Sequence, residues 1–342
     1  MQRHGTVLIG GSPLKLFRLT TAGAGVVDRL ADHEPVSDSK LTTALLDAGA
    51  IHPIPDTGRF TTADVTIVVP TLGIPDHVPA GAVVVDDGSQ PPVPDCTVRL
   101  PVNQGPAAAR NAGLELVTTD LVAFVDADVE LTDGWLDTLL PHFEDEQVAL
   151  VAPRVRASPT DTVLGRYERD ESPLDLGAEP ARVEAGSRVS YVPAAAVVCR
   201  TEAIREIGGF DTTLRFGEDV DLVGRLRRAE WTCRYEPEAQ VEHDVRGDFP
   251  SWIRQRIGYG SSAAALAKRH TGLLAPVRMS GWSAASWLLG AAGRPVLGSV
   301  VGAGSAAALI RKLPDIPPWA AFKLAGLGNV HAGNQLAAAV RR

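Results

Sequence analysis

The part of the sequence that decides the fold is LVAFVDAD, residues 121–128, in which five apolar residues precede two carboxylates separated by one alanine. A short, continuous apolar run is typical of a strand buried on both faces of a parallel sheet. Parallel α/β sheets bind ligands beyond the carboxyl ends of their strands, so Asp126 and Asp128 are expected at a binding edge. Asp also favours turns after strands, and the pair alone is therefore a weak signal.

Similar apolar runs occur upstream, at Val65–Val69 and at Ala82–Val85, and the second ends in Asp86-Asp87-Gly88-Ser89. Helical windows lie between and after the runs, at 106–116 and 135–143, and the first has Pro in its opening turn. Strands that alternate with helices predict a doubly wound α/β sheet.

The connection between the first two runs is unusual, because only Thr71–Gly81 joins them and it contains Pro75 and Pro79. This length is near the minimum for a parallel crossover and predicts no helix there. We expect either that the N-terminal residues cover that face of the sheet or that the ligand side of the sheet is altered there.

Asp126 and Asp128 offer two hard oxygen ligands with room for water, which suits Mg²⁺ or Mn²⁺ bridging a diphosphate. His243 follows a short apolar run and is a candidate third ligand beside Asp128. A lone histidine is more often structural, so this assignment depends on the fold bringing the two together.

Between the two acid clusters lies NQGPAAARNAG, residues 103–113. Its small residues let a helix begin close to a ligand, where unpaired N–H groups attract anions and Arg110 can contact phosphate. The alternative is an ordinary Ala-rich packed helix with an exposed arginine, which is the better interpretation of this segment taken alone.

Further along, FGEDVDL, residues 216–222, opens another helix. Acids in a first helical turn normally interact with the helix dipole. Beside the sheet edge, Asp219 becomes the candidate general base that takes the proton of an attacking hydroxyl, and Glu218 could hold the acceptor by hydrogen bonds.

Six segments occur in the order seen in family 2 glycosyltransferases of the GT-A fold, and this resemblance covers roughly residues 64–270. They are Val65–Pro70, Asp86–Ser89, Asn103–Gly113, Asp126–Asp128, Gly208–Asp211 and Gly217–Asp219. Each is weak alone, but the ordered set is strong. The resemblance implies a Rossmann-like mixed sheet flanked by helices, and a metal-dependent, inverting transfer of a sugar from a nucleotide sugar.

The same resemblance implies roles for individual residues. Asp86 and Asp87 would hold the base and ribose, and Arg110 and Asn111 would line the nucleotide side. Asp128 would carry the metal and Asp219 would act as the base. The further donor-site residues that it implies are Pro70, Asn103, Gly105, Asp126 and Ala127.

Residues 1–58 form a separate small α+β unit in this interpretation, with an apolar strand at Thr6–Ile9 and helices at 20–31 and 37–48. The order of these elements resembles small winged-helix modules that grip precursor peptides. Their pairing with a transferase domain, assigned to residues 62–270, is similar to the mycofactocin-system glycosyltransferases, which attach glucose to a peptide-derived redox cofactor. That resemblance implies UDP-glucose as donor; the alternative is a unit that merely covers the sheet.

The 342 residues carry a formal net charge of −8, which argues against a surface built to coat nucleic acid. Residues 271–342 reverse the sign, with seven basic residues and one acid in an Ala/Gly-rich helical tail. Its apolar runs, at 279–293 and 295–310, are shorter than a spanning helix requires. We expect interfacial or oligomer-packing helices at an anionic membrane, or a buried bundle.

Three widely spaced cysteines and an N-terminus without a secretory signal favour the cytoplasm, with peripheral contact at the inner face of the cell membrane left open. Two rival functions remain. One is a membrane-associated transferase that builds cell-envelope polysaccharide or glycolipid, and the other is a non-catalytic nucleotide-sugar-binding protein. The sequence does not exclude the acid pair of a hydrolytic glycosidase, but the diphosphate-like site disfavours it.

Overall fold

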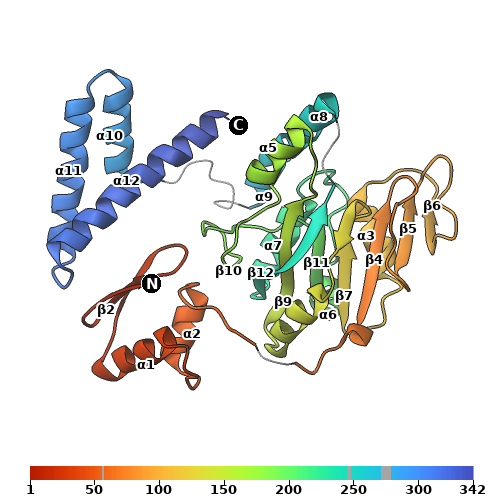
Figure 1. Cartoon of the computed structure of the whole chain (residues 1–342), viewed down its shortest axis with the longest axis horizontal. Coiled ribbons are helices and arrows are strands. Elements are labelled where there is room, and N and C mark those ends of the chain that lie inside the picture. Colours follow the sequence, from red (N-terminus) through yellow and green to blue (C-terminus); the bar gives the residue numbers. More distant parts are fainter. Residues whose placement is uncertain (56–57, 245–247, 271–278, 342) are drawn as a thin grey trace. The chain divides into compact units, whose positions relative to one another are not determined.

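The computed structural model describes residues 1–55, 58–244, 248–270 and 279–341 (Figure 1). Its contacts divide the chain into two units, one formed by Met1–Ala50 with Ala275–Arg342 and the other by Ile51–Leu274. The first eight residues of the predicted tail, 271–278, lie outside the described residues, as do Asp56 and Thr57. The predicted domain boundaries near residues 58 and 270 stay predictions.

The larger unit contains a nine-stranded mixed sheet whose main path runs β10-β12-β9-β11-β7-β4-β5-β6, with β8 paired to β12. Strands β4, β5, β6 and β7 are parallel, whereas β11 runs antiparallel between β7 and β9. The strands are β4 Val65–Thr71, β5 Val83–Asp87, β6 Val98–Leu100, β7 Leu121–Val125, β8 Val129–Leu131, β9 Val148–Ala157, β10 Ala181–Arg182, β11 Ala196–Arg200 and β12 Thr232–His243. The predicted α/β fold with a mixed sheet flanked by helices is confirmed.

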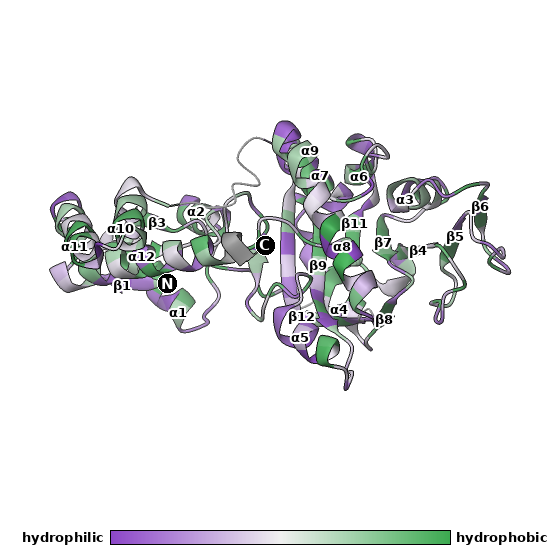
Figure 2. Ribbon diagram, turned by 90° about the horizontal axis from the view of Figure 1, so that it is seen from above, coloured by the Kyte–Doolittle hydropathy of each residue, from purple (hydrophilic) through white to green (hydrophobic). Residues whose placement is uncertain are grey.

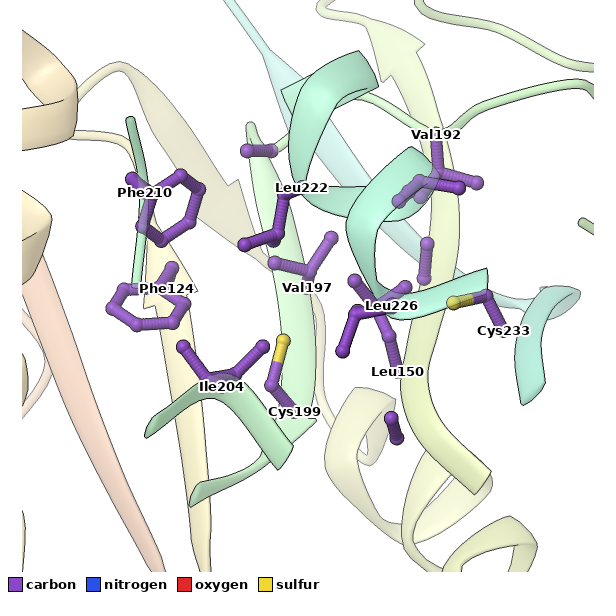
Figure 3. Packing of buried hydrophobic residues seen from close by; sticks show 14 of the residues in the cluster. Phe124, Leu150, Val192, Val197, Cys199, Ile204, Phe210, Leu222, Leu226 and Cys233 are labelled. Atoms are coloured by element: carbon purple, nitrogen blue, oxygen red, sulfur yellow. The ribbon is translucent and has the colours of Figure 1, made fainter. Parts of the chain in front are cut away.

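Helices cover both faces of this sheet. On one face lie α3 (Pro106–Leu114), α6 (Thr201–Glu206) and α7 (Glu218–Arg228), and Figure 3 shows Leu222 and Leu226 of α7 packed in one core with Ile204 and Cys199. Fully burying a leucine side chain contributes about 1.5–3 kcal/mol, so this core fixes α7 firmly on the sheet. On the other face lie α4 (Trp135–Leu139) and the 3-10 helix η2 (Leu140–Glu144).

The structure corrects one predicted helix and confirms an expected gap. The window 135–143 is split between α4 and η2, because Pro141 has no N–H to donate to an α-helical turn. Residues 72–82 are all described, and none of them is helical. The remaining helices of this unit are η1 Thr62–Asp64, α5 Val163–Glu171, α8 Phe249–Ser261 and α9 Ala263–Arg269.

The smaller unit begins with an antiparallel sheet of β1 (Gln2–His4), β2 (Val7–Gly10) and β3 (Lys15–Arg18), followed by α1 (Thr21–Ala31) and α2 (Lys40–Asp47). The side chain of Thr20 accepts the N–H of Gly23, and Ser39 forms a capping box with Thr42, so both helices begin at good N-caps. The predicted small α+β unit is therefore present.

The tail forms three helices, α10 (Gly281–Ala291), α11 (Pro295–Lys312) and α12 (Pro318–Arg341). Val7 and Ile9 of β2 share a buried cluster with Ile316 and Ala320, so part of the tail packs on the N-terminal sheet. Other large apolar side chains of these helices are exposed, and Figure 2 shows hydrophobic segments along them. Within the described ranges, none of the helices has both the length and the apolar character of a transmembrane span.

Candidate active site at the carboxyl edge of the sheet

The predicted acids lie at one edge of the large sheet, where its parallel strands end. The backbone N–H of Asp126, just after β7, donates to the carbonyl of Ala195, just before β11 (2.8 Å). Strand β8 pairs with the end of β12 so that Val129 lies opposite His243, which brings His243 beside Asp128. This edge is where α/β sheets place their ligands.

Arg110 of α3 joins two of the predicted acids. Its guanidinium donates to Asp126 Oδ1 (2.6 Å) and to Glu218 Oε1 (2.8 Å). Arg110 as a whole is only 2% exposed. The guanidinium also lies over the ring of Phe210, 5.2 Å from the centroid. The sequence predicted an arginine facing a phosphate, whereas in the structure both of its terminal nitrogens bind carboxylates of the chain itself.

This buried arrangement affects the protonation of Asp126. Burial raises the pKa of this carboxyl group, Arg110 opposes that effect, and the neighbouring Asp128 and Glu218 raise the pKa again. Removing one partner of a buried ion pair typically costs about 3–5 kcal/mol, because the remaining charge is left uncompensated. Arg110 therefore holds the end of β7 and the start of α7 together.

Asp219 follows Glu218 in the first turn of α7 and is partly buried. Burial, with a smaller contribution from the neighbouring Glu218, raises the pKa of Asp219 to about 7, although hydrogen bonds from the N–H groups of Val220 and Ala194 and the charge of Arg110 act in the opposite direction. A carboxyl group that titrates near neutral pH has the property required of a general base.

Asp128 and His243 form the second pair at this edge. The distance from His243 Nε2 to Asp128 Oδ2 is 3.4 Å, and their side chains are 14% and 40% exposed, respectively. In the part of the chain that the structure describes, no group of three His, Cys, Asp or Glu side chains is arranged to hold a metal ion. The chain thus offers one carboxylate and one imidazole side by side, while Asp126 is engaged by Arg110.

Asp86, predicted to contact the nucleotide base or ribose, is fully buried at the end of β5. It accepts hydrogen bonds from the N–H groups of Ser89 (2.8 Å) and Val93 (3.1 Å) and from the guanidinium of Arg99 (2.5 Å). Burial alone would raise the pKa of Asp86, but these donors hold it below its ordinary value. The side chain is therefore an ionised anchor for the loop after β5.

Asp87 anchors the neighbouring loop. Its two carboxylate oxygens accept the N–H groups of Gln104 (2.7 Å) and Gly105 (2.8 Å), immediately before α3. Gly105 has a φ of +96°, which L side chains rarely adopt, so glycine suits this N-cap. Asp87 thus ties the end of β5 to the start of α3.

The other predicted donor-site residues occupy varied positions. Asn111 clamps the backbone of Phe210, since its amide accepts the N–H and donates to the carbonyl of that residue, both at 2.8 Å. Asn103 is exposed and accepts a hydrogen bond from Arg215 (3.2 Å). Pro70 is buried in β4, and Ala127 lies half-buried in the turn between Asp126 and Asp128.

Sequence reasoning missed Ala194. Its carbonyl lies 3.4 Å from Arg110 and its N–H binds Asp219, so a single peptide segment contacts both sides of the site. The available signal was the run Ala194-Ala195-Ala196, which leads into β11, because small side chains let charged groups approach a backbone closely.

A small cavity of about 20 Å³ lies next to His243, between the ends of β9 and β12 and helices α5 and α8. Its walls include the aromatic side chains of Trp252 and Tyr259 and the polar side chains of Gln255 and Glu168. The indole N–H of Trp252 donates to Glu168 (2.5 Å), and Arg256 also donates to that carboxylate (2.6 Å). The recess therefore combines aromatic and charged groups beside the Asp128–His243 pair.

Comparison with known proteins bears on this site. Residues 82–208 match glycosyl transferase family 2. The chain is 45% identical over 306 residues to the pre-mycofactocin glycosyltransferase of Mycobacterium tuberculosis. The alignment covers 83% of this chain and 65% of that protein. It thus spans less than two thirds of that relative's length. The resemblance to family 2 glycosyltransferases expected from the motif order is confirmed.

Two further matches are more distant. The N-acetylglucosaminyl-diphospho-decaprenol L-rhamnosyltransferase of Mycobacterium tuberculosis is 28% identical over 178 residues, which cover 45% of this chain and 57% of that protein. The crystal structure of GalNAc-T7 with UDP, GalNAc and Mn²⁺ aligns with a TM-score of 0.39 and 15% identity, over 53% of this chain and 44% of that chain.

Proposed function

We propose that this chain, which carries a domain of glycosyl transferase family 2, transfers a sugar from a nucleotide-sugar donor to an acceptor hydroxyl with inversion at the sugar carbon. The observation that carries the proposal is the bridge from Asp126 through Arg110 to Glu218. It joins the acids after β7 to the helical turn that contains Asp219, and so brings the donor side and the base to one edge of the sheet.

In the proposed reaction the acceptor oxygen attacks the anomeric carbon while the bond from that carbon to the nucleoside diphosphate breaks. The departing diphosphate takes the electron pair of the broken bond, and Asp219 receives the hydroxyl proton. Because its pKa is raised to about 7, a substantial fraction of Asp219 is ionised at neutral pH and can accept that proton. A single displacement of this kind requires no protein nucleophile.

Asp128 and His243 are the residues that would hold a divalent cation. A carboxylate oxygen and an imidazole nitrogen suit Mn²⁺, and oxygen alone suits Mg²⁺, with diphosphate oxygens and water in the other positions. The cation would supply charge neutralisation at the leaving diphosphate. The fit rests on the 3.4 Å distance between His243 Nε2 and Asp128 Oδ2, which places a nitrogen and an oxygen donor at one point of the sheet edge.

The proposed substrates follow from the pre-mycofactocin glycosyltransferase that is 45% identical to this chain. Its name supports a peptide-derived, mycofactocin-type redox cofactor precursor as acceptor, and the resemblance of the two-part organisation to this family adds UDP-glucose as donor. Strands β1 and β3 are the edge strands of the small sheet, and such an edge can add an extended peptide as a further strand. Residues 1–58 are therefore proposed to recognise the peptide.

A membrane-associated polysaccharide or glycolipid transferase is the second candidate. Exposed apolar side chains on the tail favour it, such as Leu288 (70% exposed) and Val296 (75% exposed), together with the basic balance of residues 271–342. Under this proposal the protein sediments with anionic vesicles, and less of it sediments in high salt. Equal sedimentation with neutral and anionic vesicles would remove the electrostatic part of the proposal.

The deciding experiment for the main proposal is a product screen. The protein is incubated with several nucleotide sugars and with peptide-derived, saccharide and lipid acceptors, with Mn²⁺ or with a chelator, and the products are identified by mass spectrometry. We expect a mass increase of one hexose on the peptide-derived acceptor in the presence of the metal. Binding of nucleotide sugar without transfer to any acceptor would instead support a non-catalytic binding protein.

A further inference from the structure

Helix α9 packs against α7, the helix that begins with Glu218 and Asp219. A Cβ atom added at Gly217 would lie 2.6 Å from Leu266 of α9, and one added at Gly224 would overlap the ring of His270. Gly217 is the N-cap of α7 and Gly224 lies inside the helix, so the two contacts are about two turns apart along it. The absence of side chains at both positions is what allows the close approach of α9.

Between the two glycines, Asp221 binds the residue that follows α9. His270 Nε2 lies 2.7 Å from Asp221 Oδ1, and both residues are buried. Arg228 also contacts His270 Nδ1 at 2.6 Å. Because arginine only donates, Nδ1 must accept, and the proton of this imidazole therefore sits on Nε2 and points at Asp221. Arg225 completes the set with a 2.6 Å bond to the other Asp221 oxygen.

Two further contacts fix the same pair of helices. Leu266 shares a buried cluster with Leu214 and with Val220 in the first turn of α7. Arg269 donates to Asp211 and to the hydroxyl of Thr213, in the loop that leads to α7. The helix α9 with His270 therefore contacts α7 at its start, along its middle and through its preceding loop.

The first turn of α7 has no side-chain cap of its own. Its N-cap is Gly217, which provides no side-chain hydrogen bond. A glycine N-cap costs only a few tenths of a kcal/mol relative to Ser, Thr, Asn or Asp, so what α9 contributes is the position of this turn rather than its stability. Catalysis by a positioned carboxylate is sensitive to displacements of about 1 Å, which can cost roughly 100-fold in rate.

We infer that the packing of α9 fixes the position of the first turn of α7, and that His270 is a positioning residue for the proposed base Asp219. The inference rests on the proposed transferase function, because the turn that is held is the one that would accept the acceptor proton. It assigns α9 and His270 a role in the catalytic step rather than in donor binding, since their contacts lie on α7 and its preceding loop.

The test uses Gly224→Ala in the full-length protein, with Gly260→Ala on α8 as its matched control. A Cβ at Gly224 would meet His270, whereas one at Gly260 would meet no atom within 4 Å. For Gly224→Ala we expect kcat to fall about tenfold or more, with the KM for the nucleotide sugar within twofold of wild type. Gly260→Ala should keep both constants.

A second variant separates positioning from general damage. His270→Ala alone removes the contact with Asp221 without adding an atom to α7, and we expect kcat to fall while the KM for the nucleotide sugar stays within twofold of wild type. Hydrogen exchange in peptides covering residues 217–224 should accelerate in both Gly224→Ala and His270→Ala. A folded variant of either kind with unchanged kcat and unchanged exchange would overturn the inference.

Failure of the proposed function gives a different result. If the wild-type protein transfers no sugar to any acceptor, the transferase proposal fails, and the inference about positioning a base fails with it. Active wild-type protein with unaffected glycine variants leaves the transferase proposal intact and overturns only the role of α9.

Discussion

Two carboxylates at the same sheet edge, Asp86 at the end of β5 and Asp219 at the start of α7, have opposite environments. Asp86 is fully buried but receives three hydrogen bonds, one of them from Arg99, and its pKa is lowered. Asp219 is partly buried beside Glu218, and its pKa is raised to about 7. Burial acts in the same direction on both, so the number of donors and the nearest charge decide the difference.

The contrast separates a carboxylate that anchors the fold from one that we propose for proton transfer. A carboxylate whose oxygens are filled by donors of the chain is held ionised and stabilises the fold. One that is desolvated beside another acid is destabilising when ionised, and it takes up a proton readily. Substitutions at Asp219 and Asp86 test this division between a reactive and an anchoring carboxylate.

The largest effect is expected for Asp219→Asn. The amide keeps the size of the side chain but cannot accept a proton, so transfer should fall at least 10³-fold, near the upper range for general base catalysis. Metal-dependent binding of the nucleotide sugar should remain, and calorimetry with the donor would check it. Transfer at wild-type rates by a folded variant would remove Asp219 as the base.

The same variant also tests the energetic part of the comparison. Since the folded-state pKa of Asp219 lies above its ordinary value of 3.8, ionisation costs folding free energy that grows from about pH 4 to pH 7. Asn carries no charge, so Asp219→Asn should be more stable than wild type at pH 8 and lose that advantage near pH 4. Urea unfolding at the two pH values measures this.

The next effect concerns Asp128 and His243, the two residues proposed to hold the cation. His243→Ala should weaken binding of a nucleoside diphosphate at least tenfold when Mn²⁺ is present, because one of the two proposed protein ligands is lost. In a chelator the variant and wild type should bind the nucleotide equally. The matched control is His33→Ala, an exposed histidine of the smaller unit. An equal loss with and without metal would contradict the ligand assignment.

The parts of this structure that are local in sequence were predictable. The apolar run 121–125 forms β7, and the carboxylates that follow it lie at the carboxyl edge as expected. Helix α3 begins at Pro106, as the proline in its first turn indicates. The short connection 72–82 contains no helix, as its length and its prolines indicate. In each case neighbouring residues alone determine the outcome.

The partners of Arg110 and Asn111 could not be predicted, because they come from distant parts of the chain. Arg110 binds Glu218, 108 residues away, and Asn111 clamps Phe210, 99 residues away. An alanine-rich helix with one arginine predicts an exposed or ligand-facing charge until the packing of α7 is known. The roles in nucleotide binding implied for these residues stay predictions.

A moderate loss of stability is expected for Asp86→Asn. The amide oxygen can replace only part of the acceptor capacity and leaves Arg99 without its charged partner, so we expect the free energy of unfolding to fall by about 2 kcal/mol at pH 7. Because the folded-state pKa of Asp86 is lowered, the part of this stabilisation that depends on its negative charge is lost as the pH falls below about 3.8. The exposed Asp76→Asn serves as control in urea unfolding.

The last prediction concerns the pH dependence of transfer by the wild-type protein. Only the ionised form of Asp219 can accept the acceptor proton, so kcat/KM should rise with pH and level off above about pH 7, where the pKa of this carboxyl group lies. Below that value the rate should fall close to tenfold per pH unit. An ordinary aspartate, with a pKa near 3.8, would give a flat profile from pH 5 to 8. A flat profile with rate-limiting chemistry would therefore show that Asp219 resembles Asp86, and the distinction between the two carboxylates would be lost.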